Sequence, residues 1–181
     1  PTSPIEATPA SLAGVASIGL VGAYFTVPHV ARRIKRFMDP ASGDTFNVDL
    51  AMESFARGGW TGRGPGEGTV KRILPESHTD FIFAVLSEEF GMLGNLVLLV
   101  VYSMLVARCL MIASAAPTLF TRLLSGAIAM IFFTYAFVNM GMVSGILPVV
   151  GVPLPLVSYG GTALVTLLLG IGMLMSMPMP R

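Results

Sequence analysis

The sequence predicts an all-α polytopic membrane protein, and three observations lead to this fold class. Hydrophobic residues make up 54% of the 181 residues, charged residues only 12%, and the mean hydropathy is +0.77. A soluble domain usually has about 25% charged residues. Charge is almost absent from residues 90–181, where it is confined to Arg108, Arg122 and Arg181. Finally, four apolar segments approach the roughly 20 residues that a helix needs to cross a bilayer.

The first two predicted membrane-spanning helices cover about residues 12–30 and 81–112. The first is rich in glycine and alanine, which allow helices in a membrane to pack closely. The second is longer than one crossing requires, and its first turns carry Glu88 and Glu89. Ionisable groups so close to an apolar segment are costly to desolvate, so they indicate a functional or paired role.

The third and fourth predicted spans, about residues 119–143 and 162–177, flank an apolar segment that contains three prolines and four glycines, residues 144–161. This composition excludes a regular helix. Irregular backbone is tolerated at membrane depth only where it is buried in protein or lines a water-filled cavity. We therefore expect a re-entrant or cavity-lining segment, with an apolar surface loop as the alternative. Asn139, in the third span, needs a hydrogen-bond partner across a helix interface.

Between the first two spans lies a large polar loop, residues 31–80, with eight of the eleven basic residues. We expect a short basic helix on the membrane face at residues 31–38, and residues 58–68 are too rich in glycine for a helix. Counting lysine and arginine would place the loop in the cytoplasm, but that rule is weak for long loops. A net charge of +1 gives no reason to expect a nucleic-acid partner, and the single cysteine excludes a disulfide framework.

Residues 75–83 (PESHTDFIF) form a cluster of ionisable groups at the point where the polar loop meets an apolar segment. Asp80 is the first candidate, as a general base or a metal-binding carboxylate at the water–lipid interface, because partial burial raises a carboxyl pKa. The alternative is structural: Ser77-x-x-Asp80 fits a capping box, and an acidic residue is favourable in the first turn of a helix. The residues by themselves leave both interpretations open.

The other candidate site residues also have a structural alternative. His78 is suited to relay protons or orient Asp80, and helical spacing directs Glu88 toward the same cavity. Cationic side chains are the usual ligands of phosphate groups, although loop charges are most often solvated. Ser158 and Tyr159 either line the cavity or cap the last helix. The predicted phosphate ligands are Lys71, Arg72 and Arg63.

Two ordered motifs resemble the SEDS family (shape, elongation, division and sporulation proteins such as RodA, FtsW and SpoVE). They are residues 75–83 with Glu88-Glu89-x-Gly91, and residues 154–161 (LPLVSYGG) preceded by Asn139-x-Gly141. Residues 33–40 and 58–64 are also similar, so the resemblance extends over about residues 32–177. Residues 141–153 look like the elongation type, toward which we lean, and residues 62–72 like the division type.

The resemblance implies a fold of about ten transmembrane helices in the bacterial cytoplasmic membrane, of which this chain forms the C-terminal part. It implies that loop 31–80 is extracytoplasmic, against the count of basic residues. Because half of the usual cavity is then formed by other residues, we expect this segment to be inactive by itself.

The resemblance also implies an activity, the polymerisation of lipid II into peptidoglycan glycan strands by an inverting glycosyltransferase with Asp80 as the general base. Undecaprenyl pyrophosphate would leave, stabilised by the cationic residues with a divalent cation (Mg²⁺ or Mn²⁺), and a class B penicillin-binding protein would be the partner. Two alternatives are a lipid II flippase and a non-catalytic scaffold for that penicillin-binding protein.

Overall fold

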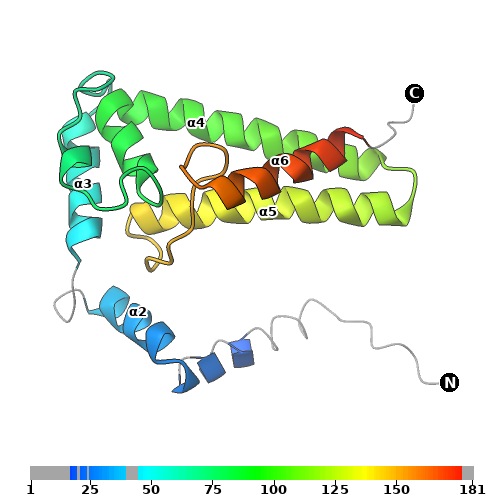
Figure 1. Ribbon diagram of the computed structural model, residues 1–181, viewed down its shortest axis with the longest axis horizontal. Helices are drawn as coiled ribbons and strands as arrows, with labels where there is room; N and C mark the ends of the chain where they lie inside the picture. The colour runs from blue at the N-terminus through cyan, green and yellow to red at the C-terminus, as the bar shows by residue number, and fades with distance from the viewer. Residues whose placement is uncertain (1–16, 20, 24, 40–44, 177–181) are drawn as a thin grey trace. The chain divides into compact units, whose positions relative to one another are not determined.

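All secondary structure in the described part of the chain is helical, as predicted. The computed structural model describes residues 17–19, 21–23, 25–39 and 45–176. The labelled elements of Figure 1, together with a short 3-10 helix η2, are α2 (Pro28–Met38), α3 (Phe46–Gly58), η2 (Val70–Arg72), α4 (Ile82–Ala115), α5 (Leu119–Val143) and α6 (Gly161–Met175). The chain divides into two compact units, Pro1–Asp44 and Thr45–Arg181, and each is described by itself.

The first unit contains α2, which confirms the predicted basic helix and begins three residues earlier than expected. Pro28 occupies the first turn, where its missing N–H costs nothing, and Val27 before it is extended. Of the first predicted span, residues 17–19, 21–23 and 25–26 are helical. The rest of that span lies outside the described residues, apart from Val27 and the start of α2, so the span as a whole is not established.

The second unit is built on a pair of long antiparallel helices, α4 and α5 (Figure 1). Both are long and apolar enough to cross a membrane, and α5 has the predicted bounds. Thr118 and Thr121 form a capping box at the start of α5, each side chain bonding the backbone of the other residue. The second and third predicted spans are therefore confirmed as apolar helices of sufficient length.

Helix α4 is broken at Gly91, which the sequence analysis treated as part of one continuous helix. Gly91 has φ 65°, a left-handed conformation that favours glycine, and it divides α4 into two parts. Loop 59–64 fills the break. The N–H groups of Arg63 and Gly64 donate to the carbonyls of Glu88 and Glu89 (both 3.0 Å), and the carbonyls of residues 59 and 60 accept from residues 92 and 93. The loop thus satisfies backbone groups that a broken helix would leave unpaired.

Helix α3 corrects the prediction of a large polar loop over residues 31–80, in which only residues 31–38 were expected to be helical. Thr45 precedes it, and its hydroxyl donates to the carboxylate of Asp49 (2.7 Å). The buried face of α3 consists of small residues, Ala51, Ser54 and Gly58, and it packs against α4. Such a face carries little hydrophobic periodicity, which explains why the sequence did not reveal this helix. Of the stretch 58–68, predicted to be non-helical, residues 59–68 are non-helical, whereas Gly58 is the last residue of α3.

Residues 144–160 are non-helical, as their prolines and glycines predicted. The segment is not a loose surface loop, because Leu154 and Pro155 are buried and the Tyr102 hydroxyl of α4 donates to the Pro155 carbonyl. Helix α6 follows with 15 residues, about 22 Å, which is shorter than the hydrocarbon core of a bilayer. Of the four predicted spans, the described residues thus contain two helices long and apolar enough to cross a membrane and one shorter apolar helix.

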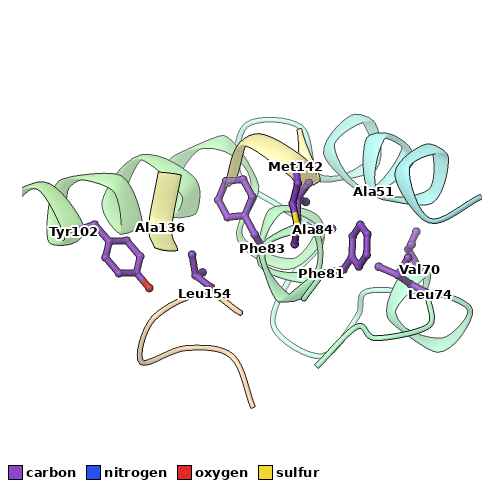
Figure 2. Close-up of a cluster of buried hydrophobic side chains, with 11 residues drawn as sticks. Ala51, Val70, Leu74, Phe81, Phe83, Ala84, Tyr102, Ala136, Met142 and Leu154 are labelled. Atoms are coloured by element: carbon purple, nitrogen blue, oxygen red, sulfur yellow. The ribbon is translucent and has the colours of Figure 1, made fainter. Parts of the chain in front are cut away.

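The main core lies where α3, η2, α4, α5 and the Pro/Gly segment meet (Figure 2). Phe81 and Phe83 extend from the start of α4 into this core, and Leu154 of the Pro/Gly segment and Met142 of α5 pack there too. A second cluster, around Phe132, joins α4, α5 and α6. The main core therefore surrounds the residues directly after Asp80 and anchors that end of α4.

Replacing Gly58 by alanine should destabilise the protein by about 1–3 kcal/mol, the usual cost of overpacking a well-packed contact. A Cβ atom at this position would overlap the Ser87 carbonyl, so α3 would have to move away from α4. The melting temperature of the purified full-length protein measures the effect. Gly126→Ala, where the added atom meets nothing within 4 Å, is the matched control, and equal melting temperatures for the two variants would contradict the prediction.

Candidate functional site

Asp80 lies at the end of a tight turn that leads into α4. The Glu76 carbonyl accepts from the N–H groups of Thr79 (3.1 Å) and Phe81 (3.2 Å), and Glu76 has φ 60°. The residue that precedes α4 is Phe81, and no side chain caps the helix. The capping-box alternative for Asp80 is therefore wrong, and its carboxylate is not used to begin the helix.

The Pro/Gly segment and α5 hold this turn by its backbone carbonyls. Three hydrogen bonds do so, donated by the Tyr159 N–H to His78 O (2.9 Å), by Ser158 Oγ to Thr79 O (2.6 Å) and by Asn139 Nδ2 to Asp80 O (2.8 Å). The donors lie 59 to 81 residues away in sequence. Three consecutive carbonyls are thus fixed from outside the turn, so the direction of the Asp80 side chain is set by tertiary contacts.

Gly151 of the Pro/Gly segment lies directly against the Asp80 carboxylate. A Cβ atom added to Gly151 would be 3.1 Å from Asp80 Oδ2, and Gly151 has φ 78°, a conformation that side chains rarely adopt. Since Ser158 and Tyr159 bond the same turn, the two motifs recognised in the sequence are brought together in space. Asp80 is enclosed on one side by the segment that the resemblance paired with it.

The Asp80 carboxylate is half-buried, and among the described residues no side chain forms a hydrogen bond or an ion pair with it. Burial raises the pKa of this carboxyl above its ordinary value, and the negative charge of Glu76 raises it further. A carboxylate without a compensating cation at the mouth of an apolar region is suited to accept a proton.

The Glu88 carboxylate binds residues 69 and 70, whereas helical spacing had directed it toward the cavity of Asp80. The Glu88 side chain is fully buried, and its carboxylate accepts from the Thr69 N–H (2.9 Å), the Thr69 hydroxyl (3.0 Å) and the Val70 N–H (2.9 Å). Arg63 lies 3.9 Å from it. Glu88 thus binds the start of η2, and the structure records no contact between it and Asp80. Its geometry is that of an anchor for the loop that carries the basic residues.

The three predicted phosphate ligands differ in their availability. Lys71 Nζ is 2.6 Å from Glu89 Oε1 and 2.9 Å from the Gly66 carbonyl, so it is paired. Arg63 is partly compensated by Glu88. Arg72 is exposed, and no ion pair joins it to a side chain in the described ranges. Of the three, Arg72 is therefore the most available to bind an anion.

The remaining predicted site residues contribute mainly through backbone or internal bonds. His78 is exposed, and its carbonyl accepts from Tyr159. The Tyr159 side chain is 82% exposed and points away from the protein core. The Ser158 hydroxyl accepts from the Leu154 N–H (2.7 Å) as well as donating to Thr79, so it is used within the protein.

No group of three or more histidine, cysteine, aspartate or glutamate side chains is placed to bind a metal ion in the part of the chain that the structure describes. Asp80 has only Glu76 as an acidic neighbour that affects its titration. The described carboxylates near Asp80 are too few to bind a metal ion with protein side chains alone. A magnesium ion is often bound by one or two carboxylates together with substrate phosphates, and only that arrangement suits these residues.

An apolar cavity of about 530 Å³ lies between α4 and α5. Its walls include Phe83 and Tyr102 of α4 and Phe133, Met140 and Gly141 of α5. Phe83, three residues after Asp80 in the sequence, lines this cavity and also belongs to the main core. One wall of the cavity is therefore formed next to the Asp80 turn along the chain. The lining suits a hydrocarbon chain or another helix.

Sequence reasoning missed two residues that shape the site. Gly151 is one of four glycines in residues 144–161, and the residues next to it in the sequence do not indicate that it contacts Asp80. Asn139 was predicted to need a partner but was not assigned to the site. An amide inside an apolar helix is a recognisable signal, yet only the tertiary structure identifies what it binds.

The described residues form an all-helical protein with two helices long and apolar enough to cross a membrane, and at the head of one of them lies a carboxylate that no described side chain pairs. A sequence model of the family described as cell cycle protein (FtsW, RodA, SpoVE) matches residues 6–181. The chain belongs to this family. It is 50% identical to the peptidoglycan glycosyltransferase MrdB of Escherichia coli (strain K12) over 150 residues, 80% of this chain and 40% of that protein. It is 34% identical over 166 residues to a probable peptidoglycan glycosyltransferase FtsW of Caulobacter vibrioides, 92% of this chain and 43% of that protein.

Solved structures support the same assignment. A chain of a peptidoglycan synthase complex that coordinates polymerization and crosslinking matches with a TM-score of 0.70 and 30% identity, over 90% of this chain and 46% of that chain. An Asp-to-Ala mutant of the rod shape determining protein RodA from Thermus thermophilus matches with a TM-score of 0.53 and 36% identity, over 70% of this chain and 38% of that chain. The present chain therefore spans about half the length of these relatives and is part of an integral membrane protein.

Replacing Gly151 by alanine should displace the Asp80 carboxylate and destabilise the protein by about 1–2 kcal/mol, because a side chain is strained in the left-handed conformation. The added Cβ atom would also press on Asp80 Oδ2. The melting temperature and an experimental structure of the full-length variant measure the two effects. Gly161→Ala, with no atom within 4 Å of the new Cβ and no positive φ, is the control. An unmoved carboxylate in Gly151→Ala would contradict the prediction.

Proposed function

We propose that the full-length protein is a peptidoglycan glycosyltransferase that polymerises lipid II, with Asp80 as its general base. The observation that carries the proposal is the Asp80 carboxylate, which is half-buried, unpaired among the described residues and fixed by three bonds to its turn. The family relatives named peptidoglycan glycosyltransferases supply the reaction class.

In the proposed reaction, Asp80 removes the proton from the 4-hydroxyl of the acceptor sugar. That oxygen forms a bond to the anomeric carbon of the donor, and the bond from this carbon to the diphosphate breaks with inversion. The proton ends on Asp80, and undecaprenyl pyrophosphate leaves with the electron pair. A raised pKa suits this role, because a base works best when its pKa lies near the operating pH.

Cationic side chains of the loop would stabilise the diphosphate as negative charge develops. Arg72 is our first choice, since Lys71 and Arg63 are close to acidic partners. A divalent cation, Mg²⁺ or Mn²⁺, bound to the diphosphate would neutralise the same charge. His78, exposed on the same turn, would assist proton transfer there.

We place the loop that contains Asp80 on the extracytoplasmic side of the bacterial cytoplasmic membrane, where peptidoglycan is assembled. The four-span topology of the ten-helix SEDS fold is part of this proposal, with α6 as the last span. The related chain in a peptidoglycan synthase complex supports a crosslinking partner, and a class B penicillin-binding protein fits that role.

Replacing Asp80 by asparagine should lower kcat for glycan formation by about 10²–10⁴-fold, the usual contribution of a positioned general base. Asparagine has nearly the same shape but accepts no proton in this range. The measurement is glycan-chain formation from lipid II by the reconstituted full-length protein with its partner. Glu67→Asn, an exposed loop position outside the turn, serves as the control.

Three outcomes would reject the catalytic assignment of Asp80. Undiminished polymerisation by a folded Asp80→Asn variant would remove the proposed base. Transfer of lipid II across proteoliposome membranes without any polymerisation would favour the flippase, and unchanged stimulation of the partner alone would favour the scaffold.

Replacing Glu76 by glutamine should move the acidic limb of the kcat–pH profile to lower pH. The charge of Glu76 raises the pKa of Asp80, so its removal lowers that pKa and keeps the base deprotonated in more acidic solution. Glutamine can still accept the Thr79 hydroxyl bond that Glu76 Oε2 accepts at 2.5 Å. Initial rates across the acidic and neutral range measure the shift, with Glu67→Gln as control. A limb that stays in place or moves upward would contradict the role of Glu76.

A further inference from the structure

Asn139 is a fully buried amide in the apolar helix α5. Its Nδ2 atom donates to two backbone carbonyls, those of Asp80 (2.8 Å) and Val152 (2.6 Å). Both partners are acceptors, so the orientation of the amide is decided by its bonding. Burying an amide is unfavourable unless its polar atoms are hydrogen-bonded, so these two bonds offset the burial of its N–H groups.

The amide connects three segments that are separate in sequence, namely α5, the Asp80 turn and the Pro/Gly segment. No other side chain in the described ranges bonds to the backbone of Asp80 itself. The second partner, Val152, directly follows Gly151, which lies against Asp80 Oδ2. Asn139 therefore holds Asp80 by its backbone and also holds the chain that borders its carboxylate.

We propose that Asn139 is a positioning residue for the general base, acting through the Asp80 backbone and through Gly151 without touching the substrate. This inference rests on the proposed function of Asp80. A displacement of a catalytic group by about 1 Å can lower the rate by roughly 10²-fold. Losing Asn139 removes both donors at once, so the turn and the bordering segment are free to separate.

The bonding of the amide also predicts how its variants rank. Within the part of the chain that the structure describes, Asn139 Oδ1 has no hydrogen-bond partner, so the two N–H bonds are the polar contribution of this side chain. Alanine removes both donors. Glutamine keeps both donors but moves them by one methylene group, so it should restore part of the geometry. A matched control on the same helix is Ser125→Ala, because Ser125 is buried and bonds the Thr121 carbonyl (2.7 Å) about 20 Å away along α5.

The experiment measures glycan formation from lipid II by the full-length protein with its partner, together with melting temperature. We expect Asn139→Ala to lower kcat by roughly 10–100-fold with KM for lipid II within about threefold of the native value. Asn139→Gln should lose less, and Ser125→Ala should keep the native kcat. In an Asp80→Asn background, Asn139→Ala should cause no further loss, since there is no base left to position.

The outcomes separate this inference from the proposed function. A native kcat in folded Asn139→Ala, or in folded Asn139→Leu (similar in size and without a donor) if the alanine variant does not fold, overturns the positioning role while leaving Asp80 in place. An equal additional loss in the Asp80→Asn background overturns it as well, because that pattern belongs to a purely structural residue. Native activity of Asp80→Asn alone rejects the proposed function instead.

Discussion

The site depends on the hydrogen bonds that tie the carbonyls of residues 78–80 to α5 and the Pro/Gly segment. A tight turn at the head of an apolar helix exposes backbone acceptors that lipid cannot satisfy, and each unsatisfied group is costly in an apolar environment. Here the donors come from residues 139, 158 and 159. The bonds that satisfy the turn also immobilise the Asp80 backbone, so fold stability and the position of the candidate base have the same origin.

A second set of hydrogen bonds satisfies backbone groups that the break in helix α4 leaves unpaired. Loop 59–64 pairs with backbone groups on both sides of Gly91, and buried Glu88 binds the start of η2. These contacts attach the polar loop to the spanning helix and place its basic residues near the head of α4. Because Lys71 and Arg63 have acidic neighbours, the loop is nearly neutral where it meets α4. The Asp80 carboxylate, in contrast, has no compensating cation among the described residues, and its pKa is raised.

The sequence analysis was most successful where one physical signal dominates. The apolar runs predicted at about residues 81–112 and 119–143 form helices over residues 82–115 and 119–143 that are long and apolar enough to cross a membrane, because hydrophobic length is a local property of the sequence. Helix α3 was missed since its buried face is made of Ala51, Ser54 and Gly58. The break at Gly91 was missed because one glycine in an apolar run does not reveal that another loop will enter there. The capping alternative for Asp80 failed for a similar reason, as the turn extends one residue further, to Phe81.

By itself, the sequence determined the helical membrane class, the non-helical Pro/Gly segment, the candidate aspartate and the family. Composition and short ordered motifs are local properties, so they need no knowledge of contacts. Only the tertiary structure decided that Asp80 caps no helix and meets Gly151, that Glu88 binds the loop, and that Asn139 holds the turn. Hydrogen bonds between residues 59 to 81 positions apart depend on how the segments pack, and no local pattern encodes their geometry.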